Sequence, residues 1–175
     1  MTQNGRFYPD EPAGPFPTPP VTCTDKKGRD IRVREFEEGD LEALAAMYDD
    51  FDPADRAQGV PPVGEERIRD WVGHLLEGYN VVALHEGRVV GHATLVEDTD
   101  EAYELAIFVH QDYQQAGIGT RLIKSLLGLG AEKGVERVWL SVERWNRAAV
   151  NLYEKVGFET TEAESFELEM AVRLH

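Results

Sequence analysis

A glycine-containing segment from Gln114 to Thr120 has the residue types that hold a phosphate group. Gly117 and Gly119 are separated by one residue and stand where the apolar pattern of a helix begins. Glycine lets backbone N–H groups approach an anion closely, and the helix dipole favours negative charge at this end. The segment therefore predicts a turn that cradles a diphosphate. It does not match the dinucleotide-binding fingerprint, because Leu122 stands where the third glycine would fall. A glycine that serves helix packing alone is the alternative.

A second segment, about thirty residues further on, predicts a helix with a ligand-facing side. Asn146 is a typical N-cap residue, and Gly157 followed by Phe158 predicts the C-cap. Between these caps, Asn146, Ala149 and Tyr153 follow spacings of three and four and so share one helix face. The small Ala149 leaves room for a ligand beneath the Tyr153 hydroxyl. A half-buried core aromatic is the alternative role for Tyr153.

Together the two segments make residues 31–173 similar to the Gcn5-related N-acetyltransferase (GNAT) family. The family motif Q/R-x-x-G-x-G/A matches Gln114, Gly117 and Gly119. The family motif N-x-x-A-x-x-L-Y-x-x-x-G-F matches the segment from Asn146 to Phe158. The resemblance implies acetyl-CoA as cosubstrate, with no metal, and direct transfer of the acetyl group to a primary amine.

The resemblance also implies a fold. We expect an α/β (α+β) single domain with a twisted mixed sheet, whose central strands 102–109 and 137–142 splay apart and hold acetyl-CoA between them. Relatives often carry Gly and Arg where this chain has Gln115 and Ala116. An arginine contact to phosphate is therefore expected to be missing, and the affinity for coenzyme A is expected to be somewhat lower.

Site residues follow from the same resemblance. By analogy with the family, the backbone N–H of Val109 holds the thioester carbonyl, Asn146 contacts the pantetheine arm or positions its helix, and Tyr153 acts as the acid for the departing thiolate. The predicted cofactor-binding residues are Phe108, Val109, Gln114, Gln115, Gly117, Ile118, Gly119, Thr120, Asn146 and Tyr153.

Glu104 is the predicted catalytic base. An acceptor ammonium, with a pKa of about 10.4 for lysine, must lose a proton before it attacks. A carboxylate flanked by Leu105 and Ala106 is expected to be partly desolvated, which raises its pKa toward the range useful for a base. Some lysine-modifying relatives place their catalytic glutamate at this strand position. A solvent-facing glutamate is the alternative reading, and His110 on the same strand face is the reserve base.

The sequence says less about which amine receives the acetyl group than about the cosubstrate. Residues 51–56 and 102–109 look like their counterparts in bacterial and archaeal protein lysine acetyltransferases, which favours a protein lysine. A polyamine or aminoglycoside is the main enzymatic alternative. Alternatives from other classes are a non-catalytic CoA-binding sensor and a nucleotide-binding regulator. A homodimer is left open.

The elements that must position these residues follow from hydrophobic periodicity, which predicts the order β-α-α-β-β-β-α-β-α-β(β). The dipeptide Glu86-Gly87 predicts a tight hairpin. The expected elements are a strand at 31–36, a helix opening at 39–40, a helix around 68–75, strands at 80–85, 88–96 and 102–109, a helix ending near 133, a strand at 137–142, a helix at 146–156 and a closing β region at 158–174.

The amino-acid composition limits the classes of partner that the protein is expected to bind. The 175 residues carry 18 Lys+Arg against 33 Asp+Glu, a net charge of −15. That charge repels phosphate backbones and anionic lipid, so neither nucleic acid nor membrane is an expected partner. No apolar run approaches the length of a membrane span or a secretory signal. The single cysteine, Cys23, excludes an internal disulfide, and we expect a cytoplasmic protein.

Several standard sites are absent from the sequence. There is no Gly-Lys dipeptide for a P-loop and no Gly-x-Ser-x-Gly nucleophile elbow, and the histidines lack metal-ligand spacing. The first 22 residues hold six of the nine prolines, which predicts a disordered proline-rich arm before an acetyltransferase domain at 23–175. Arginine outnumbers lysine 13 to 5, which fits either adaptation to high salt or an ordinary acidic surface.

Overall fold

The computed structural model describes residues 6–56, 60–98, 101–164 and 166–175. Its helices are α1 (Leu41–Asp49), α2 (Glu65–Leu75), α3 (Ile118–Glu132) and α4 (Arg147–Val156), with 3-10 turns at Glu38–Asp40, Pro53–Asp55 and Gln111–Tyr113. Its strands are β1 (Val21–Thr24), β2 (Asp30–Glu35), β3 (Tyr79–His85), β4 (Arg88–Glu97), β5 (Ala102–Val109), β6 (Arg137–Glu143), β7 (Glu159–Ala163) and β8 (Glu167–Arg173).

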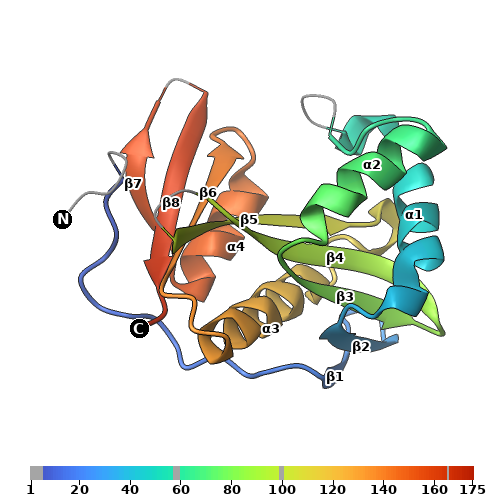
Figure 1. Ribbon diagram of the computed structural model, residues 1–175, viewed down its shortest axis with the longest axis horizontal. Helices are drawn as coiled ribbons and strands as arrows, with labels where there is room; N and C mark the ends of the chain where they lie inside the picture. The colour runs from blue at the N-terminus through green and yellow to red at the C-terminus, as the bar shows by residue number, and fades with distance from the viewer. Residues whose placement is uncertain (1–5, 57–59, 99–100, 165) are drawn as a thin grey trace.

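The strands form one mixed sheet in the order β1-β2-β3-β4-β5-β6-β8-β7. Neighbouring strands are antiparallel except for β5 and β6, which are parallel. Helices α1 and α2 cover one face of the sheet, and α3 crosses the other face beside α4 (Figure 1). This arrangement confirms the predicted fold class and the order of the elements from β2 onward.

Each helical layer has its own apolar core. The larger core is built on α3, whose Leu122, Ile123, Leu126 and Leu127 are completely buried against the sheet. The smaller core places α1 and α2 on the opposite face, around Tyr48 and neighbouring side chains. Within the described ranges, no helix combines the length and apolar character needed to span a bilayer.

The central strands part as predicted. Hydrogen-bonded pairing between β5 and β6 runs only from Ala102 opposite Arg137 to Glu104 opposite Trp139. Beyond Glu104, β5 continues beside β4 as far as Val109 opposite Gly91. The two central strands therefore diverge after Glu104, and the space between their ends is where the sequence places the cosubstrate.

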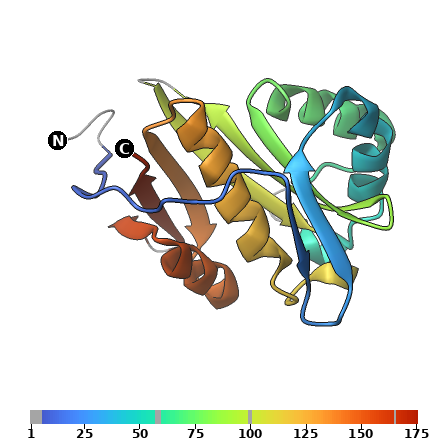
Figure 2. The ribbon, with the colours of Figure 1, turned by 90° about the horizontal axis from the view of Figure 1, so that it is seen from below.

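The N-terminal segment differs from the disordered arm that its composition predicts. The Ala13 N–H donates to the Arg173 carbonyl at 2.8 Å, and Ala13 and Phe16 pack against the larger core. The segment crosses α3 (Figure 2), where the carbonyl of Pro17 lies so close to Gly128 that a Cβ would not fit. The arm is extended and docked because its few apolar side chains reach the core. It continues directly into β1, which the sequence analysis did not predict.

Candidate active site

A cleft of about 630 Å³ lies between the end of β5, the start of α3 and helix α4. It gathers segments that are far apart in the sequence, from the β1–β2 turn to α4. The predicted cofactor-binding residues that line it are Phe108, Val109, Gln114, Gln115, Gly117, Gly119, Thr120, Asn146 and Tyr153.

Ile118 is the exception among the predicted binding residues. Its side chain is 1% exposed and belongs to the larger core beneath α3. The first residue of α3 lies on the apolar stripe of the helix, so its side chain points toward the sheet. Only its backbone remains available to a ligand, so the predicted role of Ile118 in cofactor binding stays a prediction about its backbone N–H.

The glycine turn has the geometry of an anion cradle. Gln115 (φ 58°) and Gly117 (φ 91°) both have left-handed backbone conformations, and α3 begins directly after Gly117. The first N–H groups of a helix have no partners within it, and N–H groups that converge in such turns attract anions. A Cβ on Gly119 would come within 3.4 Å of Leu152 across the cleft. Glycine at this position therefore keeps the cleft open, and the turn fits a diphosphate.

Two predicted polar residues shape the cleft through bonds to the backbone. The Gln114 side-chain amide donates to the Val109 carbonyl at 3.0 Å, which ties the end of β5 to the glycine turn. The Asn146 side-chain oxygen accepts from the Ala149 N–H at 3.2 Å, which is the predicted N-cap of α4. Both residues line the cleft and hold its walls in position.

Tyr153 lies in the wall formed by α4. Its side chain is 8% exposed, and its ring packs at a tilt against Phe158 with centroids 5.9 Å apart. Burial raises the pKa of Tyr153 to about 12. Its hydroxyl makes no hydrogen bond to any residue in the described part of the chain. The cleft therefore contains a protonated phenol that is free to donate.

Glu104 is not among the residues that line the cleft. Its own side chain is exposed between the partly buried Tyr103 and the buried Leu105, at the last pair before β5 and β6 diverge, on the strand face that also carries Phe108. Desolvation raises its pKa, the carboxylates of Asp98 and Glu169 raise it further, and the Arg6 guanidinium opposes them. The role of Glu104 as base stays a prediction.

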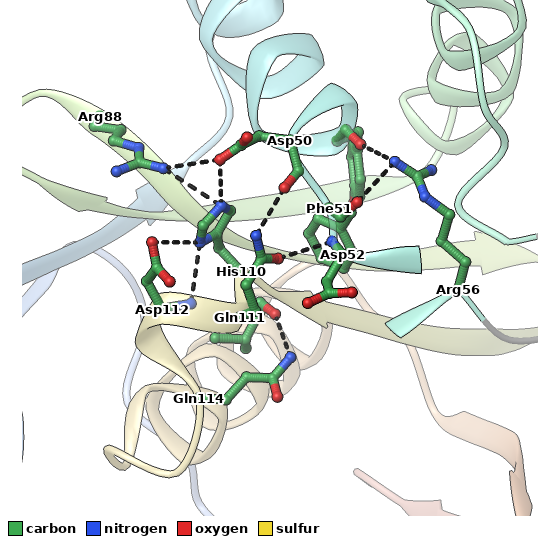
Figure 3. Close-up of polar contacts among 11 residues, drawn as sticks. Asp50, Phe51, Asp52, Arg56, Arg88, His110, Gln111, Asp112 and Gln114 are labelled. Carbon is green, nitrogen blue, oxygen red and sulfur yellow. Dashed lines mark hydrogen bonds and ion pairs between the residues drawn. The ribbon is translucent and has the colours of Figure 1, made fainter. Parts of the chain in front are cut away.

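His110, the reserve base, belongs to a polar network outside the cleft (Figure 3). It is fully buried, and its Nε2 lies 2.8 Å from an Asp50 carboxylate oxygen. The Asp112 N–H donates to its Nδ1 at 3.1 Å. Nε2 therefore carries the proton toward Asp50. Because both ring nitrogens have partners, His110 is not available as a base in this structure.

The same network positions the loop after α1. The Gln111 side chain accepts from the Asp52 N–H at 3.0 Å and donates to the Asp50 carbonyl at 2.8 Å (Figure 3). The Arg56 guanidinium donates to the Tyr48 and Phe51 carbonyls at 2.9 and 3.2 Å. These bonds hold the loop against the cleft, where it contributes Phe51, Ala54 and Asp55 to the lining.

Lys26 is a lining residue that the sequence analysis missed. Its backbone N–H donates to the Ala116 carbonyl at 3.0 Å, and its Cε lies 3.9 Å from where a Cβ on Gly117 would be. Among the described residues that line the cleft, it is the one cation. Asp25 makes its turn rigid by accepting from the N–H groups of Lys27 and Arg29, each at 2.9 Å. The Asp-Lys-Lys-Gly sequence signals that turn, but not its contact with residues ninety positions away.

The cleft also has an acidic and aromatic rim that the sequence did not single out, formed by Glu143 and Trp145. In the parts of the chain that the structure describes, no group of three or more His, Cys, Asp or Glu side chains could hold a metal ion.

Comparison with known proteins is consistent with this geometry. The model of the acetyltransferase (GNAT) family matches residues 42–158, which include the glycine turn and the α4 segment. The chain therefore belongs to the GNAT family of acetyltransferases. An uncharacterized N-acetyltransferase from Mycobacterium tuberculosis is 34% identical over 89 residues, 50% of this chain and 57% of the relative. The [ribosomal protein bS18]-alanine N-acetyltransferase of Escherichia coli is 35% identical over 79 residues, 45% of this chain and 53% of the relative. The chain thus spans about half the length of these curated relatives.

Solved structures resemble most of the chain. The GNAT domain of PAT from S. lividans superposes with a TM-score of 0.75 at 15% identity, covering 89% of this chain and 97% of that one. The ribosomal-protein-alanine N-acetyltransferase from Brucella melitensis gives a TM-score of 0.68 at 25% identity, covering 81% and 99%. At 15% identity the first likeness shows the fold alone, and it supports the splayed mixed sheet.

Proposed function

We propose that this chain is an acetyl-CoA-dependent N-acetyltransferase that moves the acetyl group directly to a primary amine, and that the amine is a protein lysine. The observation that carries the proposal is the cleft itself. It combines a glycine turn at a helix start, a strand end freed from its neighbour and an unpartnered phenol. Acetyl-CoA supplies the activated acetyl group as a thioester.

The residues present fit the parts of that cosubstrate. The free N–H groups at the start of α3 face a diphosphate, and the Lys26 ammonium adds the positive charge that the turn itself lacks. Lys26 therefore takes the place of the arginine that Gln115 and Ala116 do not provide. The Val109 N–H donates to the thioester carbonyl and stabilises the oxyanion that develops there.

Two ionisable groups, Glu104 and Tyr153, have roles in the transfer step. Glu104 does not line the cleft, so it accepts the proton that the acceptor ammonium releases through an intervening water, and its raised pKa favours this role. The amine nitrogen then forms a bond to the carbonyl carbon while the carbon–sulfur bond breaks, and the second proton that the nitrogen must lose passes to solvent water. Tyr153 donates a hydrogen bond to the departing thiolate. Because the pKa of Tyr153 is about 12 and that of an ordinary thiol is about 8.5, this bond stabilises the thiolate without full proton transfer.

A lysine acceptor is favoured by charge and by the loop at 51–56. The net charge of −15 attracts cationic proteins. Residues 51–56 resemble their counterparts in protein lysine acetyltransferases, and this loop lines the cleft. The names of the two ribosomal-protein-alanine N-acetyltransferases indicate a second candidate, the α-amino group of a protein N-terminus. A polyamine or aminoglycoside is a third.

Thiol release tests the function and ranks the acceptors. The purified chain is mixed with acetyl-CoA and one of four amines: a lysine peptide with a blocked N-terminus, an alanine-initiated peptide without lysine, spermidine or an aminoglycoside. Fastest release with the lysine peptide supports the proposal. Fastest release with another amine reassigns the acceptor. Binding of acetyl-CoA without release for any amine would make the chain a non-catalytic CoA sensor.

A further inference from the structure

Arg6 of the N-terminal segment occupies a built cation site. Its guanidinium carbon lies 3.5 Å from the centre of the Trp139 ring. Its Nη1 lies 3.3 Å from Asp98 Oδ2, and its Nε lies 3.3 Å from Glu169 Oε1. An aromatic face between two carboxylates is an arrangement that recognises a planar cation.

The site lies next to the point where the central strands part. Trp139 on β6 stands opposite Glu104 on β5, in the last pair of that register. On the other side, Trp139 stands opposite Ala171 on β8, two residues from Glu169, so Trp139 and Glu169 share one sheet face. The cation site therefore adjoins the proposed base.

Two further observations concern the surroundings of this site. Trp139 is about nine-tenths buried, yet its indole N–H has no hydrogen-bond partner among the described residues, so it is free to donate to an acceptor such as a peptide carbonyl. The carboxylates of Asp98 and Glu169 contact the Arg6 guanidinium, which also acts electrostatically on Glu104, and Arg137 is a second cation near the same group of side chains. Arg6 is also the one cation in the first 22 residues.

We propose that Trp139, Asp98 and Glu169 form a subsite for a cationic side chain of the acceptor, adjacent to the reacting amine, and that Arg6 occupies it as an internal competitor. The ligand class is a guanidinium on a peptide, because that group is the one seated there. Release of Arg6 then admits the arginine of an acceptor that carries its target lysine nearby. This inference rests on the proposed transfer to a peptide amine.

A kinetic comparison tests the subsite. The acceptor probes are acetyl-Arg-Gly-Lys-Gly-Arg-amide and the same peptide with glutamine in place of both arginines. In the full chain, Arg6→Ala should raise kcat/KM about tenfold for the arginine peptide, as expected when a competitor occupies about nine-tenths of the sites. The value for the glutamine peptide should change less than twofold, and Arg6→Lys, which keeps the charge but loses the planar group, should give a rise between those of wild type and Arg6→Ala.

Arg32→Ala is the matched control, because it removes an exposed arginine from β2, near the opposite edge of the sheet. An equal rise with Arg32→Ala, or the same rise for both peptides, would reduce the effect to overall charge and overturn the proposal. No change with Arg6→Ala would make Arg6 an anchor of the arm only. If Arg6→Ala folds poorly, Arg6→Gln replaces it.

A binding readout separates this inference from the proposed function. The indole N–H signal of Trp139, assigned with Trp139→Phe, should shift when Arg6 is replaced and shift again when the arginine peptide is added. These shifts require no acetyl transfer. Shifts of the Trp139 signal without acetyl transfer would contradict the proposed function but support a cation site. Acetyl transfer without these shifts would contradict the subsite.

Discussion

Replacing Tyr153 with phenylalanine removes one oxygen from the cleft and leaves the ring packed on Phe158. Because the hydroxyl bonds to no described residue, its removal leaves no other group without a partner, and the free energy of unfolding should change by less than about 1 kcal/mol. The cleft wall keeps its shape, so acetyl-CoA affinity should stay within about twofold of wild type. Any larger effect on turnover then reports on chemistry.

The expected loss of turnover follows from the state of the phenol. With a pKa of about 12, Tyr153 is protonated at every working pH and acts as a hydrogen-bond donor. A hydrogen bond to a charged group contributes about 1.5–3 kcal/mol. If that bond forms only as the thiolate departs, its loss lowers kcat by roughly ten- to 150-fold.

The assay follows thiol release at saturating acetyl-CoA and lysine peptide, with calorimetry for acetyl-CoA affinity and thermal unfolding for stability. Tyr103→Phe is the matched control, since Tyr103 lies on β5 but does not line the cleft. An unchanged kcat for Tyr153→Phe would remove Tyr153 from the chemistry. An equal loss of acetyl-CoA affinity would make it a binding residue instead.

Three further predictions test the cofactor contact, the base and the core. Lys26→Ala should weaken acetyl-CoA binding about fivefold at low salt and less at high salt. Lys27→Ala, in the same turn but outside the cleft lining, should leave the affinity unchanged. Calorimetry at two ionic strengths compares the two variants, and equal losses of affinity would contradict a specific contact by Lys26. Glu104→Gln should lower kcat/KM about a hundredfold at pH 7. The value should recover partly in alkali, because the acceptor amine is already deprotonated there. A pH profile of kcat/KM parallel to that of wild type would argue against Glu104 as base. Burial lowers the pKa of His92 to about 3, below its unfolded value of about 6.5, so the folded state binds fewer protons and loses stability as pH falls below 6.5. Urea unfolding between pH 7 and 4 should show this slope, and His92→Gln should flatten it; parallel slopes would mean that other groups dominate.

The central elements were predictable because their signals are local. The apolar run of β5, the glycines before α3 and the Asn146 cap of α4 each lie within one element, and the structure reproduces them. Glu86 and Gly87, with φ of 51° and 79°, likewise form the predicted hairpin turn. Spacing within a segment therefore sufficed to identify nine of the nineteen described residues that line the cleft.

Contacts between distant segments were not predictable in this way. Lys26 reaches the glycine turn only because the four-residue strand β1 pairs with β2, and so short a strand carries little periodic signal. The docked arm and the Arg6 site depend on β6 and β8 lying side by side. His110 looked like a reserve base on its strand, but Asp50 and Asp112 engage both of its nitrogens.

A crystal structure of the chain with acetyl-CoA would show whether the cleft holds the cosubstrate as proposed. We expect diphosphate oxygens within about 3.5 Å of the backbone N–H groups that start α3. We also expect the Lys26 ammonium beside the diphosphate and the sulfur facing the Tyr153 hydroxyl. Coenzyme A bound away from the diverging ends of β5 and β6, or a sulfur directed away from Tyr153, would contradict the proposed function.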